Sequence, residues 1–134
     1  MRYLAKRVER ICDELYRLRI VQRIPLTDLI CKKGTYIRPE AADAATPPWT
    51  SFDSRTMHWY GPDEHYWFRT EFTVPKALNG KAMWLNVRTQ IEGDDGKNPQ
   101  FLLFVNNVPV QGMDMNHRDV LLSPKAISGE KLVF

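Results

Sequence analysis

The sequence predicts a mainly β protein, an antiparallel β-sandwich of the jelly-roll type that follows an N-terminal α-helical segment. Short apolar or alternating runs succeed one another after residue 49, and Gly, Pro and Asn separate them as turn residues. Before residue 49, apolar residues recur at helical spacing instead. We therefore expect a helical segment with a linker over residues 1–48 and a sandwich domain over residues 49–134.

Length and composition favour one compact soluble domain. A chain of 134 residues buries roughly two-thirds of its unfolded surface, which is enough for a core of its own. No apolar run approaches the roughly 18 residues of a membrane span, and the first ten residues carry charges where a signal peptide is apolar. Cys12 and Cys31 have neither metal-site nor redox-motif spacing. We expect reduced thiols, a cytoplasmic location and no membrane contact.

Charge is unevenly distributed along the chain. Residues 1–38 hold ten Lys or Arg against four Asp or Glu, whereas the remainder holds nine against twelve. A basic N-terminus can mark nucleic-acid binding, but Arg10 with Glu14 and Asp13 with Arg17 have the i,i+4 spacing of a solvated helix face. We expect no nucleic-acid partner and expect the helix to dock on an acidic surface of the same protein.

The first 48 residues predict two helices and a linker. The first helix covers residues 2–19, because five apolar residues alternate at spacings of four and three: Leu4, Val8, Ile11, Leu15 and Leu18. This stripe spans fewer than three heptads, too short to prefer a coiled coil over packing on a neighbouring surface. A second short helix is expected over residues 27–32, ending at Gly34, and an extended surface linker over residues 39–48.

The remaining residues predict a series of strands. Strict alternation predicts strands over residues 65–74 and 82–87, followed by a long polar turn over residues 91–98. Residues 101–105 and 108–110 are expected to form a hairpin around Asn106 and Asn107. Because Pro109 has no N–H, the second strand should lie on an edge or pair only where this missing N–H faces solvent. The last four residues again have strand character. We therefore expect the sandwich to be truncated at its C-terminus and the chain to be part of a longer polypeptide.

Two strings carry a resemblance to a known family. NPQFLLFVNNVPVQGMDMNHRDVLL, residues 98–122, and HYWFRTEFTVP, residues 65–75, look like the region just before the catalytic domain in glycoside hydrolase family 38 alpha-mannosidases of the cytosolic and bacterial type. The shared pattern is a strand, an Asn-rich turn, a strand and QG-x-D-x-NH-[RK], and the resemblance covers roughly residues 49–134.

The resemblance implies a galactose-binding-like sandwich that acts as a non-catalytic N-terminal domain. In the parent enzyme, a following catalytic domain would hydrolyse alpha-mannosides with retention, on an Asp beside a divalent metal, expected to be zinc. The partners implied are that catalytic domain and, through the parent, an alpha-mannoside; a homo-oligomer stays open.

The residues themselves predict no catalytic, cofactor or metal site in this chain. A glycosidase needs two carboxyl groups on opposite sides of one bond. The neighbouring carboxylates occur in turn-like contexts, where Asp usually bonds its own backbone: Asp63 with Glu64, Asp94 with Asp95, and Asp114 with Asp119. Asp114 and His117 could share a metal with His58 or His65, but zinc sites draw on three or more ligands at recognisable spacing.

Two groups of residues are candidate binding sites. The first comprises Asp114, Asn116, His117 and Arg118, which either brace one another or contact the following catalytic domain at the rim of its sugar site. The second comprises Trp67 and Trp84, which alternate away from the apolar faces of their strands and are candidates for sugar stacking or an interface. Large aromatic residues more often fill a core or an interdomain seam.

Two other functions stay open. A free-standing carbohydrate-binding module would expose an aromatic platform and bind sugar without a partner domain. A protein-interaction module that uses the basic N-terminal helix would leave the apolar stripe of that helix exposed.

Overall fold

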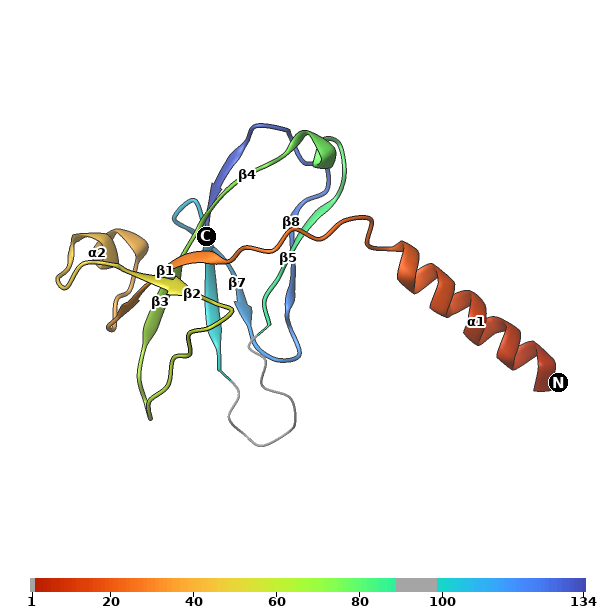
Figure 1. The fold of residues 1–134 in the computed structure, drawn as a ribbon, viewed down its shortest axis with the longest axis horizontal. Coiled ribbons are helices and arrows are strands. Elements are labelled where there is room, and N and C mark those ends of the chain that lie inside the picture. Colours follow the sequence, from red (N-terminus) through yellow and green to blue (C-terminus); the bar gives the residue numbers. More distant parts are fainter. Residues whose placement is uncertain (1, 89–98) are drawn as a thin grey trace.

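The fold consists mainly of short antiparallel strands. A computed structural model describes residues 2–88 and 99–134 of the chain, drawn in Figure 1. In chain order the elements are α1 (Arg2–Leu18), β1 (Asp28–Lys33), α2 (Pro39–Ala44), β2 (Thr50–Asp53), β3 (Tyr66–Arg69), β4 (Glu71–Thr73), the short 3-10 helix η1 (Lys76–Leu78), β5 (Met83–Asn86), β6 (Phe101–Val105), β7 (Val108–Met113), β8 (Asp119–Ser123) and β9 (Lys131–Val133). The predicted mainly β, antiparallel class is confirmed.

The strands of residues 2–88 and 99–134 form four small sheets. The largest has the order β2-β1-β3, and three pairs complete the set: β4 with β9, β5 with β8, and β6 with β7. Every pairing is antiparallel. The predicted polar turn over residues 91–98 lies outside the described residues.

The predicted hairpin is confirmed. Asn106 and Asn107 take φ values of 50° and 67°, the left-handed conformation that Asn tolerates better than most residues. Pro109 lies opposite Phe104, next to a register shift that interrupts the regular ladder. Among the described residues β7 pairs with β6 alone, so Pro109 is on an edge strand as expected.

The strand predicted over residues 65–74 is divided between two sheets. Its first half, β3, pairs with β1, and its second half, β4, pairs with β9. The change of partner occurs at Thr70, whose side-chain hydroxyl donates to the carbonyl of Asp28 at 2.9 Å while its backbone N–H donates to Phe134. Thr70 therefore ties the two sheets together.

The helix predicted over residues 27–32 is wrong, because residues 28–33 form β1. This strand is the centre of its sheet and pairs with β2 on one side and β3 on the other. Backbone pairing on both edges outweighs the weak helical preference of six residues. Gly34, expected as a helix cap, follows the strand and donates its N–H to the carbonyl of His65 at 2.9 Å.

The extended linker predicted over residues 39–48 is wrong in its first half. Residues 39–44 form α2, which begins with Pro39 at a position where its missing N–H costs nothing. Ala42 lies on the inner side of this helix and is fully buried. Three alanines within six residues favour the helix. The proline-rich residues that follow favour an extended chain, and this opposing preference hides the helix in the sequence.

Two groups of apolar side chains hold the strands together. The first is a buried cluster from the residue after β4, from β5, from β9 and from the loop before β9: Val74, Met83, Ala126 and Leu132. The second is a chain of edge-to-face aromatic contacts that links β2 and β3 with β6: Phe52, Trp59, Phe68 and Phe101. The second group spans sheets that share no strand.

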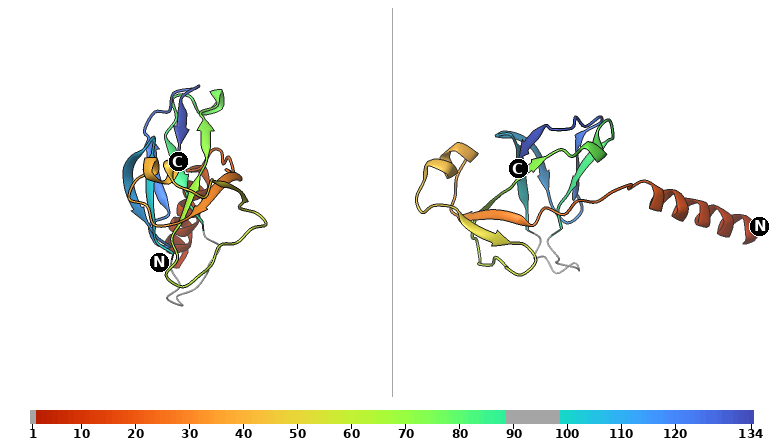
Figure 2. Two further views of the ribbon diagram at one scale, coloured as in Figure 1. Left: turned by 90° about the vertical axis from the view of Figure 1, so that its left-hand side faces the viewer. Right: turned by 45° about the horizontal axis from the view of Figure 1, so that its top comes forward.

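The predicted N-terminal helix is confirmed as α1, and it projects away from the strands (Figures 1 and 2). All five residues of its apolar stripe are exposed, with exposed fractions from 50% to 73%. Arg10 and Glu14 pair at 3.3 Å across one turn, as their spacing predicts. Docking of α1 on the same protein stays a prediction. Within the described residues, every helix is too short or too polar to cross a membrane.

Candidate functional site

The loop between β7 and β8, residues 114–118, is organised by one carboxylate. Oδ1 of Asp114 accepts the backbone N–H groups of Asn116 at 2.7 Å and His117 at 2.8 Å, and it lies 3.0 Å from Nδ1 of His117. The backbone N–H of His117, followed by that of Asn116, holds the pKa of Asp114 below its ordinary value. These bonds favour the ionised form of Asp114, which accepts hydrogen bonds more strongly than a neutral carboxyl group.

The other end of this loop is tied to β5. Arg118 donates through Nε to the carbonyl of Met115, and its own carbonyl accepts the N–H of Val87 at 3.0 Å. Asn116 is exposed, and the side chain of His117 is 71% exposed. Asp114 and Arg118 therefore brace the loop, while Asn116 and His117 face outward. A contact between these two residues and another domain stays a prediction.

Next to this loop lies an exposed face of the β5–β8 pair. We define the β5–β8 face as the outward side chains of Trp84, Asn86, Arg88, Asp119 and Leu121. Trp84 lies opposite Leu121 and Asn86 opposite Asp119, so each pair shares one side of the sheet. The neighbouring residues Met83 and Val120 are buried, which places the β5–β8 face away from the core.

The β5–β8 face has an apolar end and a polar end. At the apolar end, Trp84 is 58% exposed and Leu121 is 43% exposed. At the polar end, Nδ2 of Asn86 donates to Oδ1 of Asp119 at 2.8 Å, and Nε of Arg88 donates to Oδ1 of Asn86 at 3.1 Å. The two ends are two strand positions apart, which corresponds to about 7 Å.

The structure thus brings one sequence candidate, Trp84, onto the same pair of strands as the loop over residues 114–118. Sequence reasoning missed the partners of Trp84, namely Asn86, Arg88 and Leu121, and gave Asp119 only a turn-forming role. The alternation over residues 82–87 already places Asn86 on the side of Trp84. Asp119 and Leu121 join them through strand register, which local patterns do not reveal.

The other candidate aromatic, Trp67, is packed. Its ring stacks on Phe104 with centroids 5.6 Å apart and meets Tyr36 edge-on at 6.3 Å. Trp67 therefore joins β3 to β6 and presents no open ring face comparable with that of Trp84. The two tryptophans lie on different sheets, so they do not form one platform.

A buried lysine fixes α2 against the largest sheet. Lys32 of β1 is 3% exposed, and its Nζ donates to the carbonyls of Ala42 and Ala45 at the end of α2. The rings of Tyr36 and Trp49 face this ammonium at 5.4 Å and 5.8 Å. The charge is thus satisfied by carbonyl oxygens and aromatic faces, which is the arrangement of a structural lysine.

An ion pair lies beside this lysine. Arg69 of β3 donates to both oxygens of Asp43 at 2.7 Å, and Nε1 of Trp49 donates to the same carboxylate at 3.1 Å. Asp43 lies in α2, so the pair holds the same helix to the sheet from a second point.

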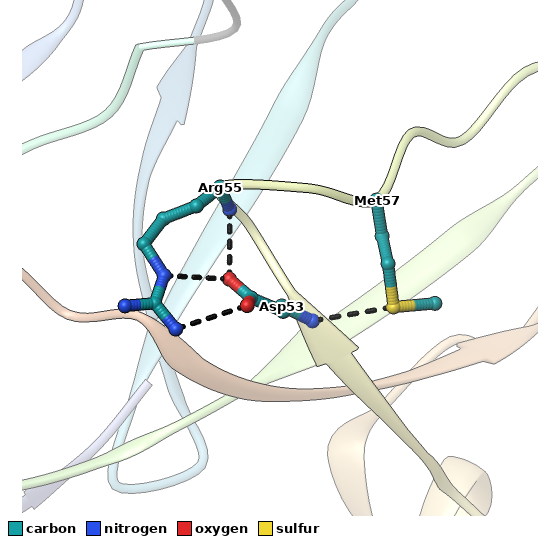
Figure 3. A network of polar contacts seen from close by, with 3 residues as sticks. All are labelled: Asp53, Arg55 and Met57. Atoms are coloured by element: carbon teal, nitrogen blue, oxygen red, sulfur yellow. Dashed lines mark hydrogen bonds and ion pairs between the residues drawn. The ribbon is translucent and has the colours of Figure 1, made fainter.

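A compact polar turn closes β2 (Figure 3). The carboxylate of Asp53 accepts the backbone N–H of Arg55 and two N–H groups of its guanidinium, each at 2.9 Å. The guanidinium of Arg55 is the largest cause that lowers the pKa of Asp53 to about 2. The backbone N–H of Asp53 donates to Sδ of Met57 at 3.4 Å. Every partner is local, which indicates a structural turn.

A large apolar hollow runs between the N-terminal segment and the sheets. Its volume is about 1960 Å³, whereas pockets for small ligands hold roughly 300–1,000 Å³. Apolar residues from several elements line it, among them Ile24, Leu29, Phe72, Leu85 and Leu103. A hollow of this size fits a polypeptide segment or domain surface better than a small molecule.

Two further residues considered as candidates, Glu64 and His65, have partners elsewhere in the fold. Glu64 pairs with Lys33 at 2.7 Å, and Nδ1 of His65 lies 3.4 Å from the hydroxyl of Thr35. Asp94 and Asp95 lie outside the described residues. Over residues 2–88 and 99–134, no group of three or more His, Cys, Asp or Glu side chains could hold a metal ion. Comparisons with protein-family models, curated proteins and solved structures found no match.

Proposed function

We propose that this chain is the non-catalytic N-terminal domain of a cytoplasmic alpha-mannosidase similar to those of glycoside hydrolase family 38. Its role is to brace the catalytic domain that follows in the same polypeptide. The parent enzyme hydrolyses alpha-mannosides with retention and uses a divalent metal, expected to be zinc, in that catalytic domain. The resemblance of residues 65–75 and 98–122 to the family is the reason for this choice of parent.

The observation that carries the bracing role is apolar surface left uncovered. The apolar stripe of α1 is exposed along its whole length, and the apolar hollow is too large for a small ligand. Proteins that act alone rarely leave contiguous apolar patches of this extent in water. A neighbouring domain that covers the stripe and the hollow would remove this apolar surface from water. Asn116 and His117, which also line the hollow, are available for polar contacts with that domain.

The finer fold belongs to the same proposal. We take the four sheets as parts of a jelly-roll, galactose-binding-like sandwich, because side chains from separate sheets meet face to face. Trp59 contacts Phe68 of β3 at 5.1 Å and Phe101 of β6 at 6.1 Å between centroids. Trp67 and Phe104 make a second such contact. Aromatic contacts between strands of different sheets are typical of two packed layers.

The test is hydrolysis of a chromogenic alpha-mannoside by residues 1–134 and by the longer product of the reading frame, each with and without added Zn²⁺. We expect activity only in the longer, metal-loaded protein. Activity of residues 1–134 alone would overturn the proposal, and so would inactivity of the longer protein towards alpha-mannosides under every metal condition.

The rim contact has its own test in the longer protein. His117→Ala is expected to lower activity or thermal stability there, because His117 is exposed in this chain and covered in the proposed assembly. Tyr60→Ala is the matched control, since Tyr60 is an 86% exposed aromatic residue outside this region. A His117→Ala protein with unchanged activity and stability would exclude the contact.

The exposed stripe of α1 also favours a second function, a protein-interaction module. The two functions differ in what covers the stripe. If the stripe braces the catalytic domain, Ile11→Asp destabilises the longer protein even when no other protein is present. If the chain is an interaction module, Ile11→Asp abolishes binding of the partner and leaves the stability of the longer protein unchanged.

A further inference from the structure

The β5–β8 face combines an exposed tryptophan with a hydrogen-bonded group of polar side chains. Tryptophan is usually well buried in proteins, yet Trp84 is 58% exposed and lies beside Leu121, which is also exposed. The hydrogen-bonded group of Asn86, Arg88 and Asp119 begins about 7 Å along the same side of the strand. A flat apolar surface and a set of polar groups thus lie side by side, held by paired strands.

The charges of the β5–β8 face indicate which kind of ligand it can bind. Arg88 and Asp119 carry opposite charges, so the face favours neither a polyanion nor a polycation. A purely apolar partner would cover Asn86 and Asp119 and remove them from water without replacing the lost hydrogen bonds. A neutral ligand with one apolar side and several hydroxyl groups matches both ends of the face.

We propose that the β5–β8 face binds a hexopyranose unit of a neutral oligosaccharide. The sugar places its C–H side on the ring of Trp84 and directs hydroxyl groups to Asn86, Arg88 and Asp119. A guanidinium carries five N–H donors and a carboxylate accepts about four hydrogen bonds, so the bonds within the group use part of this capacity. The site lies within this chain, but Trp84, Asn86, Arg88 and Asp119 also line the apolar hollow, so a domain that filled the hollow would compete with the sugar for this face.

The pairing of β5 with β8 supports a preformed site. The cross-strand bond from Asn86 to Asp119 fixes both side chains, and the bond from Arg88 to Asn86 orients the guanidinium. The loop over residues 114–118 leads into β8 and is braced by Asp114 and Arg118. Side chains held in advance lose little conformational freedom when a ligand binds.

The test is isothermal titration of residues 1–134 with mannotriose and with maltotriose, using sorbitol as an acyclic polyol control. We expect at least one trisaccharide to bind and sorbitol to give no heat of binding. Trp84→Ala should lower the association constant by about tenfold or more, equivalent to about 1.4 kcal/mol. Trp84→Phe, which keeps an aromatic face, should retain most of the affinity, and Asn86→Ala and Asp119→Ala should each weaken binding several-fold.

Tyr60→Ala is the matched control, because it removes another exposed aromatic ring and should leave binding unchanged. Far-ultraviolet circular dichroism and the melting temperature establish that each variant is folded. The proposal is overturned if neither trisaccharide binds, if Trp84→Ala binds as tightly as the unmodified chain, or if light scattering shows a dimer that Trp84→Ala dissolves. In that last case a second copy of the chain covers the face.

Discussion

Oδ1 of Asp114 accepts the backbone N–H of His117 at 2.8 Å and lies 3.0 Å from Nδ1 of the same residue. A single carboxylate oxygen therefore contacts both the backbone and the ring of His117, an exposed residue in the loop over residues 114–118. The ionised form of Asp114 strengthens these bonds and so helps to hold His117 in its outward direction.

Asp114→Ala is expected to lower the melting temperature near neutral pH. The folded state lowers the pKa of Asp114 below its ordinary value of 3.8, so its stabilising contribution is fully present above that value. The contribution is lost as the pH falls through the folded-state pKa, and the difference from the unmodified chain should then vanish. Melting curves over an acidic pH series measure it. Glu130→Ala, another exposed carboxylate, is the control, and equal melting temperatures at every pH would contradict the prediction.

Arg55→Ala is expected to raise the pKa of Asp53 from about 2 part of the way towards 3.8. The rise is incomplete, because the backbone N–H of residue 55 still donates to the carboxylate. A carbon-detected NMR titration of the Asp side chains measures the change. Arg10→Ala in α1 serves as the control for the loss of one positive charge. A pKa of Asp53 that stays near 2 would show that the guanidinium is not the main cause.

The sequence predicts local features well and tertiary ones poorly. The hairpin at Asn106 and Asn107 and the braced loop around Asp114 follow from residues adjacent in sequence. Local patterns predict a helix at β1, because its strand character comes from partners 19 to 39 residues away in β2 and β3. Likewise, α2 depends on Lys32, and nothing in a ten-residue window shows that its ammonium reaches the carbonyls of Ala42 and Ala45.

The β5–β8 face is likewise only partly predictable from local sequence patterns. Alternation in β5 identifies Trp84 as outward-facing and places Asn86 beside it, so half of the β5–β8 face is encoded locally. The other half comes from β8 through a register that pairs Asn86 with Asp119. Trp67 shows that alternation alone does not establish exposure. It points away from the apolar face of its own strand, yet Phe104 from another sheet packs against its ring.

Lys32→Ala is expected to destabilise the fold by about 1–3 kcal/mol, because two carbonyls at the end of α2 lose their buried donor. Lys32→Met keeps the apolar stem of the side chain but removes the donor. Its loss of stability should be smaller than that of Lys32→Ala if packing dominates, and nearly equal to it if the hydrogen bonds dominate. Urea unfolding gives the free energies. Lys33→Ala, whose side chain is 56% exposed, is the neighbouring control and should have a much smaller effect. Equal effects at the two lysines would show that Lys32 is not structural.

Leu132→Ala is expected to cost about 2–5 kcal/mol, the usual range for removing a buried leucine side chain. Leu132 is 6% exposed and belongs to the cluster that joins β4, β5 and β9. Leu102→Ala is the matched control: Leu102 is 59% exposed on β6, and its truncation should change stability by about 0.5 kcal/mol or less. Urea unfolding of both variants tests the position of the core. A larger loss at Leu102 would mean that the outer side of β6 is packed in solution.

Ile11→Asp and Leu15→Asp in α1 are expected to leave the melting temperature of residues 1–134 unchanged, since both side chains are at least half exposed. In the proposed longer protein the same substitutions should lower the melting temperature, because an aspartate would then be buried at the proposed domain contact without a partner. Ala5→Asp introduces the same charge elsewhere on the helix and controls for the lower helix propensity of Asp. Melting curves of all variants in both proteins separate the cases. Destabilisation of residues 1–134 would mean that α1 packs on its own strands, and unchanged stability of the longer protein would favour an external partner for the stripe.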